Sequence, residues 1–185
     1  MALESMFRFD YKESLTAAMA WLGKQPDTLF IGQTVGYPGS YMHVSLRDVR
    51  PGKKLELPVA EELQMGISLG LAMEGFVPIS VFPRFDFLLL ALNQLVNHID
   101  KIGWMSEAQM QPRIIIRTST GPRMPLDAGP QHTQDHTEAV KRMLTTVTLV
   151  TIKTGHSALP WYKRAYKDER RRLWLFVESG ELYGS

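Results

Sequence analysis

Apolar and polar positions along the chain form blocks that predict helices and strands in turn. An apolar run over residues 28–31 follows a Lys-Gln-Pro-Asp turn and predicts a buried strand. The segment before this turn, residues 11–23, is predicted to be a helix. Its apolar residues at helical spacing are Leu15, Ala18, Met19 and Leu22.

The middle of the chain repeats this order. Pro58 stands just ahead of Glu61, where a helix to Ala72 is predicted to begin. Gly66 and Gly70 lie four residues apart in this helix, a spacing that predicts close packing against a neighbour. A buried strand is predicted over residues 77–82 and a long helix over residues 86–105.

Alternation of strand and helix continues to the end of the chain. β-branched and apolar runs predict three more strands, and two helices are predicted between them. Each parallel crossover needs a covering helix, so we expect a three-layer, doubly wound α/β fold with a mainly parallel sheet and helices on both faces. The predicted strands span residues 113–118, 147–152 and 173–177, and the helices residues 137–144 and 157–169.

Composition narrows the class of protein. The 185 residues carry a formal net charge of +2 and 44% apolar residues, values typical of one globular domain over residues 1–185. No cysteine is present, which fits a reducing compartment, and we expect a cytoplasmic protein. Residues 1–14 lack the apolar core of a secretory signal, and no stretch offers a bilayer span. Neither a membrane nor a nucleic acid is expected as a partner.

Few short motifs point to chemistry by themselves. Neither a Gly-x-Gly-x-x-Gly turn nor a phosphate-binding loop is present. His132 and His136 have metal-ligand spacing, but the sequence shows no second cluster of ligands, and a solvated pair is the alternative. Glu61 lies in a predicted first turn, where a carboxylate gains about 0.3 to 1 kcal/mol. Three arginines are candidates for a phosphate site, with a solvated or interface edge as the alternative: Arg113, Arg117 and Arg123.

Taken together, four segments resemble the pyrimidine-binding domain of the transketolase group of thiamine diphosphate enzymes. The pattern is most similar to the beta subunit of 2-oxo acid dehydrogenases, and it runs from about Pro58 to Tyr183. Its segments are LPVAEELQMGISLGLAMEGFVPISVF, RFDFLLLALNQLVNHIDK, RIIIRTSTG and HTQDHTEA.

This resemblance implies thiamine diphosphate as the cofactor and assigns roles to several residues. Glu61 matches the carboxylate that binds the pyrimidine ring and promotes loss of the thiazolium proton. Phe87 matches the aromatic residue that stacks on this ring, with Val59 nearby. His132 matches a histidine that transfers protons at the substrate end. The remaining candidates on the substrate side are Arg84, Gln134 and His136.

Departures from the family pattern limit what the resemblance implies. Pro83 and Arg84 stand where the family has other residues, so we expect a different substrate pocket. The sequence lacks the Gly-Asp-Gly motif and downstream Asn that hold Mg²⁺ and the cofactor diphosphate. It also lacks the transketolase C-terminal domain. No metal site is therefore expected in this chain, and a separate alpha-like subunit with the Gly-Asp-Gly motif is expected to hold the metal.

The leading hypothesis is a beta-like subunit of a split thiamine diphosphate enzyme. It would decarboxylate a 2-oxo acid or transfer a ketol or acyl group, within a heterotetramer or around a homodimeric core. The alternative is a non-catalytic assembly or regulatory module derived from such a domain. Retention of Glu61, Phe87 and His132 argues against this alternative.

Overall fold

A six-stranded parallel sheet forms the centre of the computed structural model, which describes residues 2–124, 127–170 and 172–183, with side chains from residue 11. The strand order is β2-β1-β3-β4-β6-β5, and every neighbouring pair is parallel. The predicted α/β class is confirmed. The strands are β1 (Thr28–Gly32), β2 (Lys54–Glu56), β3 (Val77–Phe82), β4 (Ile114–Thr120), β5 (Thr148–Ile152) and β6 (Leu173–Ser179).

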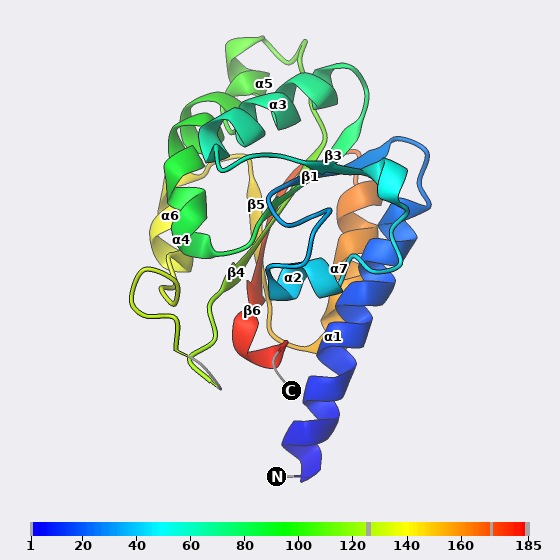
Figure 1. Ribbon diagram of the computed structural model, residues 1–185. Helices are drawn as coiled ribbons and strands as arrows, with labels where there is room; N and C mark the ends of the chain where they lie inside the picture. Colours follow the sequence, from blue (N-terminus) through cyan, green and yellow to red (C-terminus); the bar gives the residue numbers. More distant parts are fainter. Residues whose placement is uncertain (1, 125–126, 171, 184–185) are drawn as a thin grey trace.

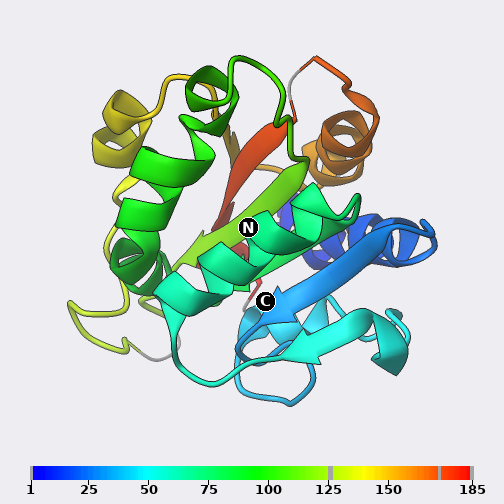
Figure 2. The ribbon, with the colours of Figure 1, turned by 90° about the horizontal axis from the view of Figure 1, so that it is seen from above.

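Helices cover both faces of the sheet, as predicted. Figure 2 shows the sheet between α1 and α7 on one side and α3, α4 and α6 on the other. The α-helices are α1 (Ala2–Gly23), α2 (Tyr41–Val44), α3 (Glu61–Met73), α4 (Phe85–Leu88), α5 (Ile102–Met105), α6 (Thr137–Met143) and α7 (Gly155–Lys167). Short 3₁₀ turns are η1 (Pro51–Lys53), η2 (Leu89–Ala91) and η4 (Gly180–Leu182).

Burial on both faces explains the long apolar runs of the central strands. All six residues of β3 are buried, as are the first six of β4 and of β6. A parallel sheet between two helical layers has no solvated face, so its strands do not alternate between apolar and polar residues. The helical layers therefore enclose one apolar core on each face of the sheet.

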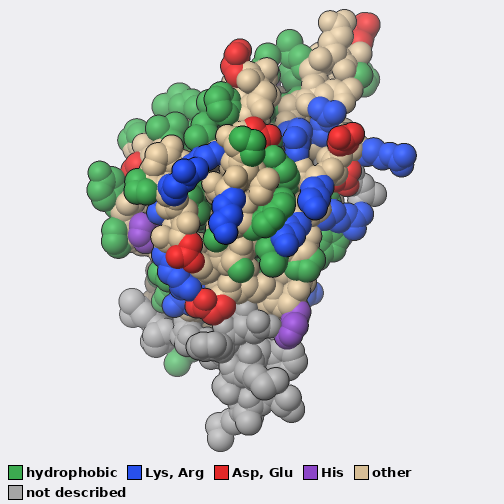
Figure 3. Space-filling model, turned by 90° about the vertical axis from the view of Figure 1, so that its right-hand side faces the viewer, with side chains coloured by type: hydrophobic (Ala, Val, Ile, Leu, Met, Phe, Trp, Pro, Cys, Tyr) green, Lys and Arg blue, Asp and Glu red, His purple; other side chains and the backbone are tan. Residues whose placement is uncertain are grey.

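The outer face of α1 and α7 carries Lys and Arg side chains among apolar ones (Figure 3). The ammonium groups of Lys163 and Lys167 lie 5.5 and 5.9 Å from the ring centre of Trp21. Such contacts stabilise a cation on an aromatic face. No helix in the described ranges is both long and apolar enough to cross a bilayer.

The prediction of one continuous helix over residues 86–105 is wrong in detail. The path is helical but changes type, from α4 through η2 to a π-helix, η3 (Gln94–Ile99), and then to α5. The widened turn ends at Asp100, whose backbone N–H donates to Leu95 O at 2.9 Å. Tertiary hydrogen bonds to the Asp100 carboxylate accompany this turn, and apolar periodicity carries no signal of them.

The glycine face of α3 has no close packing partner among the described residues. A Cβ added at Gly66 or Gly70 would meet no atom within 4 Å. Leu63 and Met73 of the same helix are about half exposed, at 55% and 50%. The predicted close neighbour of this helix is thus not a described part of this chain, and it stays a prediction for a partner; this face of α3 is open.

Arg117 is buried in the core and forms no phosphate site or solvated edge. Its guanidinium donates to the Glu178 carboxylate at 2.8 and 3.0 Å, and neither side chain is exposed. It also donates to the hydroxyls of Ser45, Tyr162 and Tyr183 at 3.1 to 3.2 Å, and both tyrosines donate to Glu178.

Glu178 holds the pKa of Arg117 far above its usual value, although burial acts in the opposite direction. The network joins β4 and β6 to α2, α7 and η4.

Removing the charge of Arg117 should lower the free energy of unfolding. Arg117→Met leaves the Glu178 carboxylate buried without its partner, so we expect a loss of about 3 to 5 kcal/mol in the free energy of unfolding. Urea denaturation measures this loss. The control is Arg47→Met, which removes an exposed ion pair with Glu13 and should cost less than about 1 kcal/mol. Equal losses in the two variants would contradict the role of the buried pair.

A second buried carboxylate predicts acid sensitivity. Asp100 accepts from the backbone N–H groups of Thr145, Thr146 and Val147 at 2.8 to 3.1 Å. Burial would raise the pKa of Asp100, but hydrogen bonds from Lys101 and these groups hold it well below its usual range. The resulting stability is present above the unfolded pKa of about 3.9 and is lost as the pH falls toward the folded pKa.

We therefore expect Asp100→Asn to lose on the order of 3 kcal/mol at neutral pH. The difference from the native chain should shrink as the pH falls below about 4. Urea denaturation across pH measures both effects. The matched control is Asp48→Asn at an exposed carboxylate. A pH-independent difference would show that Asp100 acts through packing alone.

Candidate active site

The carboxyl edge of the sheet carries the predicted site residues. The loops that follow β1, β3 and β4 all leave this edge, at the lower side of Figure 1. The chain passes from β1 to β2 on one side and then to β3 on the other, so the strand order reverses between β1 and β3. Ligands of open parallel sheets bind at the carboxyl ends of the strands beside such a reversal.

Glu61 begins α3 at this edge and is buried, with 5% exposure. Its Oε1 accepts a hydrogen bond from Gln33 Nε2 at 3.0 Å, and Gln33 directly follows β1. One turn later the buried Gln64 donates to Ser80 Oγ and Val81 O, both at 3.0 Å. These contacts fix the start of α3 against β3, so the position of the Glu61 carboxylate is set by the sheet.

Residues 85–87 and 132–136 pair in antiparallel order, and we call this arrangement the Phe-His zipper. Phe87 contacts His132 edge to face at 5.5 Å between ring centres, and Phe85 contacts His136 in the same way at 5.5 Å. Between them Gln134 Nε2 donates to Asp86 Oδ1 at 2.8 Å. The zipper holds the long loop after β4 against α4.

Buried polar atoms in the zipper have no hydrogen-bond partner among the described residues. They are His132 Nδ1, His136 Nε2 and Asp86 Oδ2. His136 Nε2 lies 3.6 Å from Asp86 Oδ1, within ion-pair range but beyond a good hydrogen bond. Burying such atoms unpaired is unfavourable, which is typical of a place that a ligand completes.

The other predicted residues occupy different surroundings. Val59 is 77% exposed just before α3. Arg84 is half-buried, and its guanidinium lies over the ring of Tyr41. The structure thus brings Phe87, His132 and the two other candidates of the loop after β4 together. Among the described residues, no hydrogen bond, ion pair or ring contact joins Glu61 or Val59 to the zipper.

Sequence reasoning missed two partners. Gln33 pairs with Glu61, and its only sequence signal is its position directly after a predicted strand. Asp86 lies within the matched segment RFDFLLLALNQLVNHIDK, but its hydrogen bond to Gln134 depends on tertiary contact. Within the described ranges, no group of three or more His, Asp or Glu side chains could hold a metal ion.

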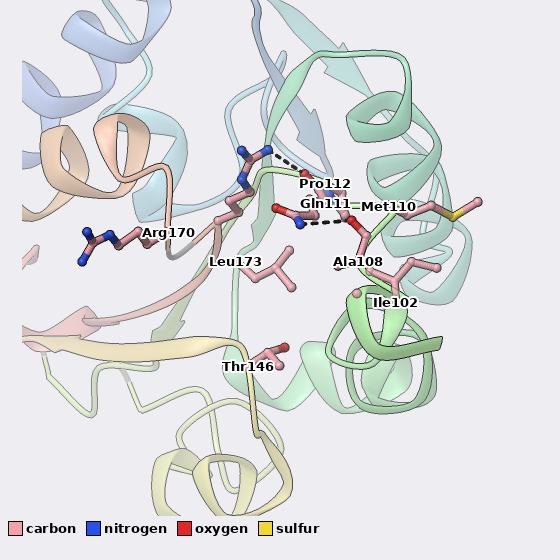
Figure 4. Close-up of a pocket in the computed structure, with 10 residues that line it drawn as sticks. Ile102, Ala108, Met110, Gln111, Pro112, Thr146, Arg170 and Leu173 are labelled. Carbon is pink, nitrogen blue, oxygen red and sulfur yellow. Dashed lines mark hydrogen bonds between the residues drawn. The ribbon is translucent and has the colours of Figure 1, made fainter. Parts of the chain in front are cut away.

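A cavity of about 290 Å³ lies at the opposite edge of the sheet. Leu173 begins β6, and Thr146 and Pro112 lie shortly before β5 and β4, so the cavity faces the amino ends of the strands (Figure 4). The side chain of Arg170 points away from the other labelled residues in this view. Because none of the site residues lines this cavity, the carboxyl edge remains the candidate site.

Comparison with known proteins finds relatives that share one name. The chain is 30% identical to the "Pyruvate dehydrogenase E1 component subunit beta" of Cyanidium caldarium over 170 residues, which is 88% of this chain and 50% of that protein. It is 33% identical to the protein of the same name from Gracilaria tenuistipitata var. liui over 159 residues, 83% of this chain and 47% of that protein. This chain is a homologue of pyruvate dehydrogenase E1 beta subunits. It spans about half the length of these relatives, and no protein-family profile matches it.

Solved structures show the same fold at low sequence identity. A transketolase from Campylobacter jejuni subsp. jejuni matches with a TM-score of 0.70 at 15% identity, over 91% of this chain and 25% of that one. A structure titled "Split gene transketolase, inactive beta4 tetramer" matches with a TM-score of 0.60 at 15% identity, over 90% and 49%. The resemblance to the transketolase group, drawn from sequence motifs, is confirmed.

The zipper makes a testable prediction for the mobility of the loop after β4. Asp86→Ala removes the acceptor for Gln134, so we expect faster amide exchange in residues 127–136. Asp86→Asn retains an acceptor oxygen and should exchange nearly as the native chain does. Hydrogen–deuterium exchange with mass spectrometry measures both variants. Equal exchange in Asp86→Ala and the native chain would show that the two ring contacts alone hold the loop.

Proposed function

We propose that this chain, over residues 1–185, is the pyrimidine-binding subunit of a split thiamine diphosphate enzyme. In this role it would decarboxylate a 2-oxo acid or transfer a ketol or acyl group. The observation that carries the proposal is the buried Glu61 carboxylate at the carboxyl edge of the sheet, fixed by Gln33 at 3.0 Å. The homology to pyruvate dehydrogenase E1 beta subunits supports it.

The residues present fit a flat, neutral ring with a polar nitrogen at its edge. Only Oε1 of Glu61 is engaged by Gln33, so Oε2 is available to bind a ring N–H. Phe87 is half-buried and offers an apolar face, and Val59 adds exposed apolar surface before α3. When bound, thiamine diphosphate supplies a thiazolium carbon that becomes a nucleophile after losing its proton. The role of Glu61 is to hold the proton at the ring nitrogen.

The zipper residues fit the substrate end of the site. His132 is held by Phe87, and its buried Nδ1 has no partner in the described part of the chain. An imidazole exchanges protons near neutral pH, so His132 would donate to or accept from the reacting oxygen. Gln134 and His136 follow on the same loop and share Asp86 as a partner. They would orient this loop and line the substrate pocket.

The open apolar face of the chain supports a partner subunit. A Cβ added at Gly66 or Gly70 of α3 would meet no described atom within 4 Å, and Leu63, Met73 and Leu90 are 50 to 65% exposed. Exposed apolar surface of this kind is typical of a subunit interface. We propose an alpha-like partner with a Gly-Asp-Gly motif, which would hold Mg²⁺ and the cofactor diphosphate, in a heterotetramer or around a homodimeric core. A reducing compartment such as the cytoplasm fits a chain without cysteine.

The alternative is a non-catalytic assembly or regulatory module. Single unpaired buried atoms also occur in the core, on Arg117, Thr118 and Gln64, but the three on His132, His136 and Asp86 cluster in the zipper, and this clustering argues against the alternative.

Hydrogen–deuterium exchange at the thiazolium carbon, in the complex reconstituted with the alpha-like partner, tests the proposal. Glu61→Gln keeps the shape of the side chain but loses its charge, so exchange should slow on the order of 100-fold or more. Glu62→Gln is the matched control, because Glu62 is the neighbouring carboxylate of the same turn and is exposed. Native exchange in Glu61→Gln would overturn the assignment of Glu61.

His132→Ala tests the role of His132 at the substrate end separately from the role of Glu61 at the cofactor ring. It should leave exchange at the thiazolium carbon nearly native while substrate turnover slows, since His132 belongs to the substrate end. Steady-state kinetics on a panel of 2-oxo acids measures this turnover. Loss of exchange in His132→Ala would instead place His132 beside the cofactor ring.

A further inference from the structure

The loop that follows β1 is built as a fixed structure. Thr34 has a φ of 56°, a left-handed conformation that is strained for a β-branched residue. Glu56, at the end of β2, accepts from the backbone N–H groups of Thr34 and Gly36, both at 2.7 Å. The Oγ atoms of Thr34 and Ser40 lie 2.7 Å apart. Such strain persists only where surrounding contacts enforce it, and it is common at ligand sites.

This loop forms one wall of a cavity of about 460 Å³. The wall runs over residues 38–44 and includes the N-cap of α2, Ser40, and the side chains of Tyr41 and His43. His43 Nδ1 lies 3.1 Å from Thr34 O, so this nitrogen donates to the carbonyl and orients the ring. The cavity therefore has a preformed polar lining at the carboxyl edge of the sheet.

Arg84 closes the cavity from the other side. It follows β3, and its guanidinium lies 5.8 Å from the ring centre of Tyr41. Among the described residues no carboxylate lies within ion-pair distance of it, and no hydrogen-bond acceptor is recorded for it. Burial lowers the pKa of Arg84, and Tyr41 and Asp86 oppose this effect. An arginine remains charged in any case, so a half-buried cation faces the cavity without a counter-ion.

The cavity combines two independent features, a position at the strand-order reversal and an unpaired guanidinium. The cavity is lined by the segments that follow β1 and β3, the two strands between which the strand order reverses. A parallel sheet binds ligands at such a reversal. A guanidinium pairs best with the two oxygens of a carboxylate or a phosphate. We propose that the cavity between Arg84 and residues 38–44 is a subsite for a second anionic group of the substrate.

This proposal rests on the proposed function and deepens it by naming the substrate class. The reacting carboxylate of a 2-oxo acid is a poor occupant, because a cation that stabilises it in the ground state would oppose its loss as CO₂. The cavity lining also includes none of Glu61, Phe87 or His132. The substrate would therefore carry its second anion, a carboxylate or a phosphate, at the end remote from the reacting carbon.

Anion binding to the full chain alone tests the subsite without cofactor or partner. The probes are inorganic phosphate and succinate, followed through the Arg84 Nε–H and His43 ring signals in ¹⁵N-edited NMR spectra. We expect saturable shifts that weaken on the order of 10- to 100-fold in Arg84→Gln. Arg84→Lys should retain part of the affinity. Arg170→Gln, at an exposed arginine beside the cavity on the opposite edge of the sheet, is the control and should bind as the native chain does.

The two anions distinguish the sources of the charge. Tighter binding of phosphate indicates a phosphorylated substrate, and tighter binding of succinate indicates a dicarboxylate. Absence of saturable shifts, or equal affinity in Arg84→Gln and the native chain, overturns the proposal.

A kinetic arm uses the reconstituted complex and compares 2-oxo acids with and without a second anionic group. Arg84→Gln should lower the ratio of their kcat/KM values on the order of 10-fold or more. An unchanged ratio would overturn the subsite even where thiazolium exchange is native. Failure of the Glu61 experiment leaves the phosphate titration of the chain intact, so the two proposals fail separately.

Discussion

The buried ion pair between Arg117 and Glu178 sets the geometry of the carboxyl edge of the sheet. It joins the ends of β4 and β6, and through hydroxyl groups it also holds Ser45 after α2, Tyr162 of α7 and Tyr183 after η4. Two buried charges are costly unless they are paired and hydrogen-bonded, and five hydrogen bonds from the guanidinium engage its Nε and Nη2 while Nη1 has no partner among the described residues. These contacts hold the surrounding elements in defined positions. The edge that carries the candidate site is thus held from the face of α1 and α7, opposite the zipper.

One face of the sheet carries the larger apolar core, and the other carries the candidate site residues. On the face of α1 and α7, a large apolar core and the buried pair provide rigidity. On the other face, α3 and α4 bring Glu61 and the Phe-His zipper to the edge, and α3 remains open toward a partner. This arrangement suits a subunit that contributes half of a site. In the proposed role, its candidate catalytic groups are positioned by its own core, and its exposed apolar surface would contact the partner subunit.

The charged side chains at the candidate site differ in whether they have a partner within the chain. The carboxylates are engaged within the chain, Glu61 by Gln33 and Asp86 by Gln134, whereas the cation of Arg84 faces open space. An unpaired, half-buried guanidinium favours an anionic ligand, because the ligand supplies the missing counter-ion. Substrate preference in this chain would therefore follow from Arg84, one of the positions at which the sequence departs from its family pattern.

The sequence by itself determined five of the six strands, the longer helices, the parallel sheet and its two helical layers, because continuous apolar runs and helical periodicity are local signals. The short strand β2 and the short helix α2 were not predicted from it. It also indicated Glu61, Phe87 and His132 through motif spacing. Tertiary structure alone decided that residues 85–87 pair with residues 132–136, that Arg117 is buried opposite Glu178, and that the helix over residues 86–105 changes type before Asp100. These features depend on hydrogen bonds and charges between segments about 45 to 61 residues apart, which the pattern of apolar positions does not encode.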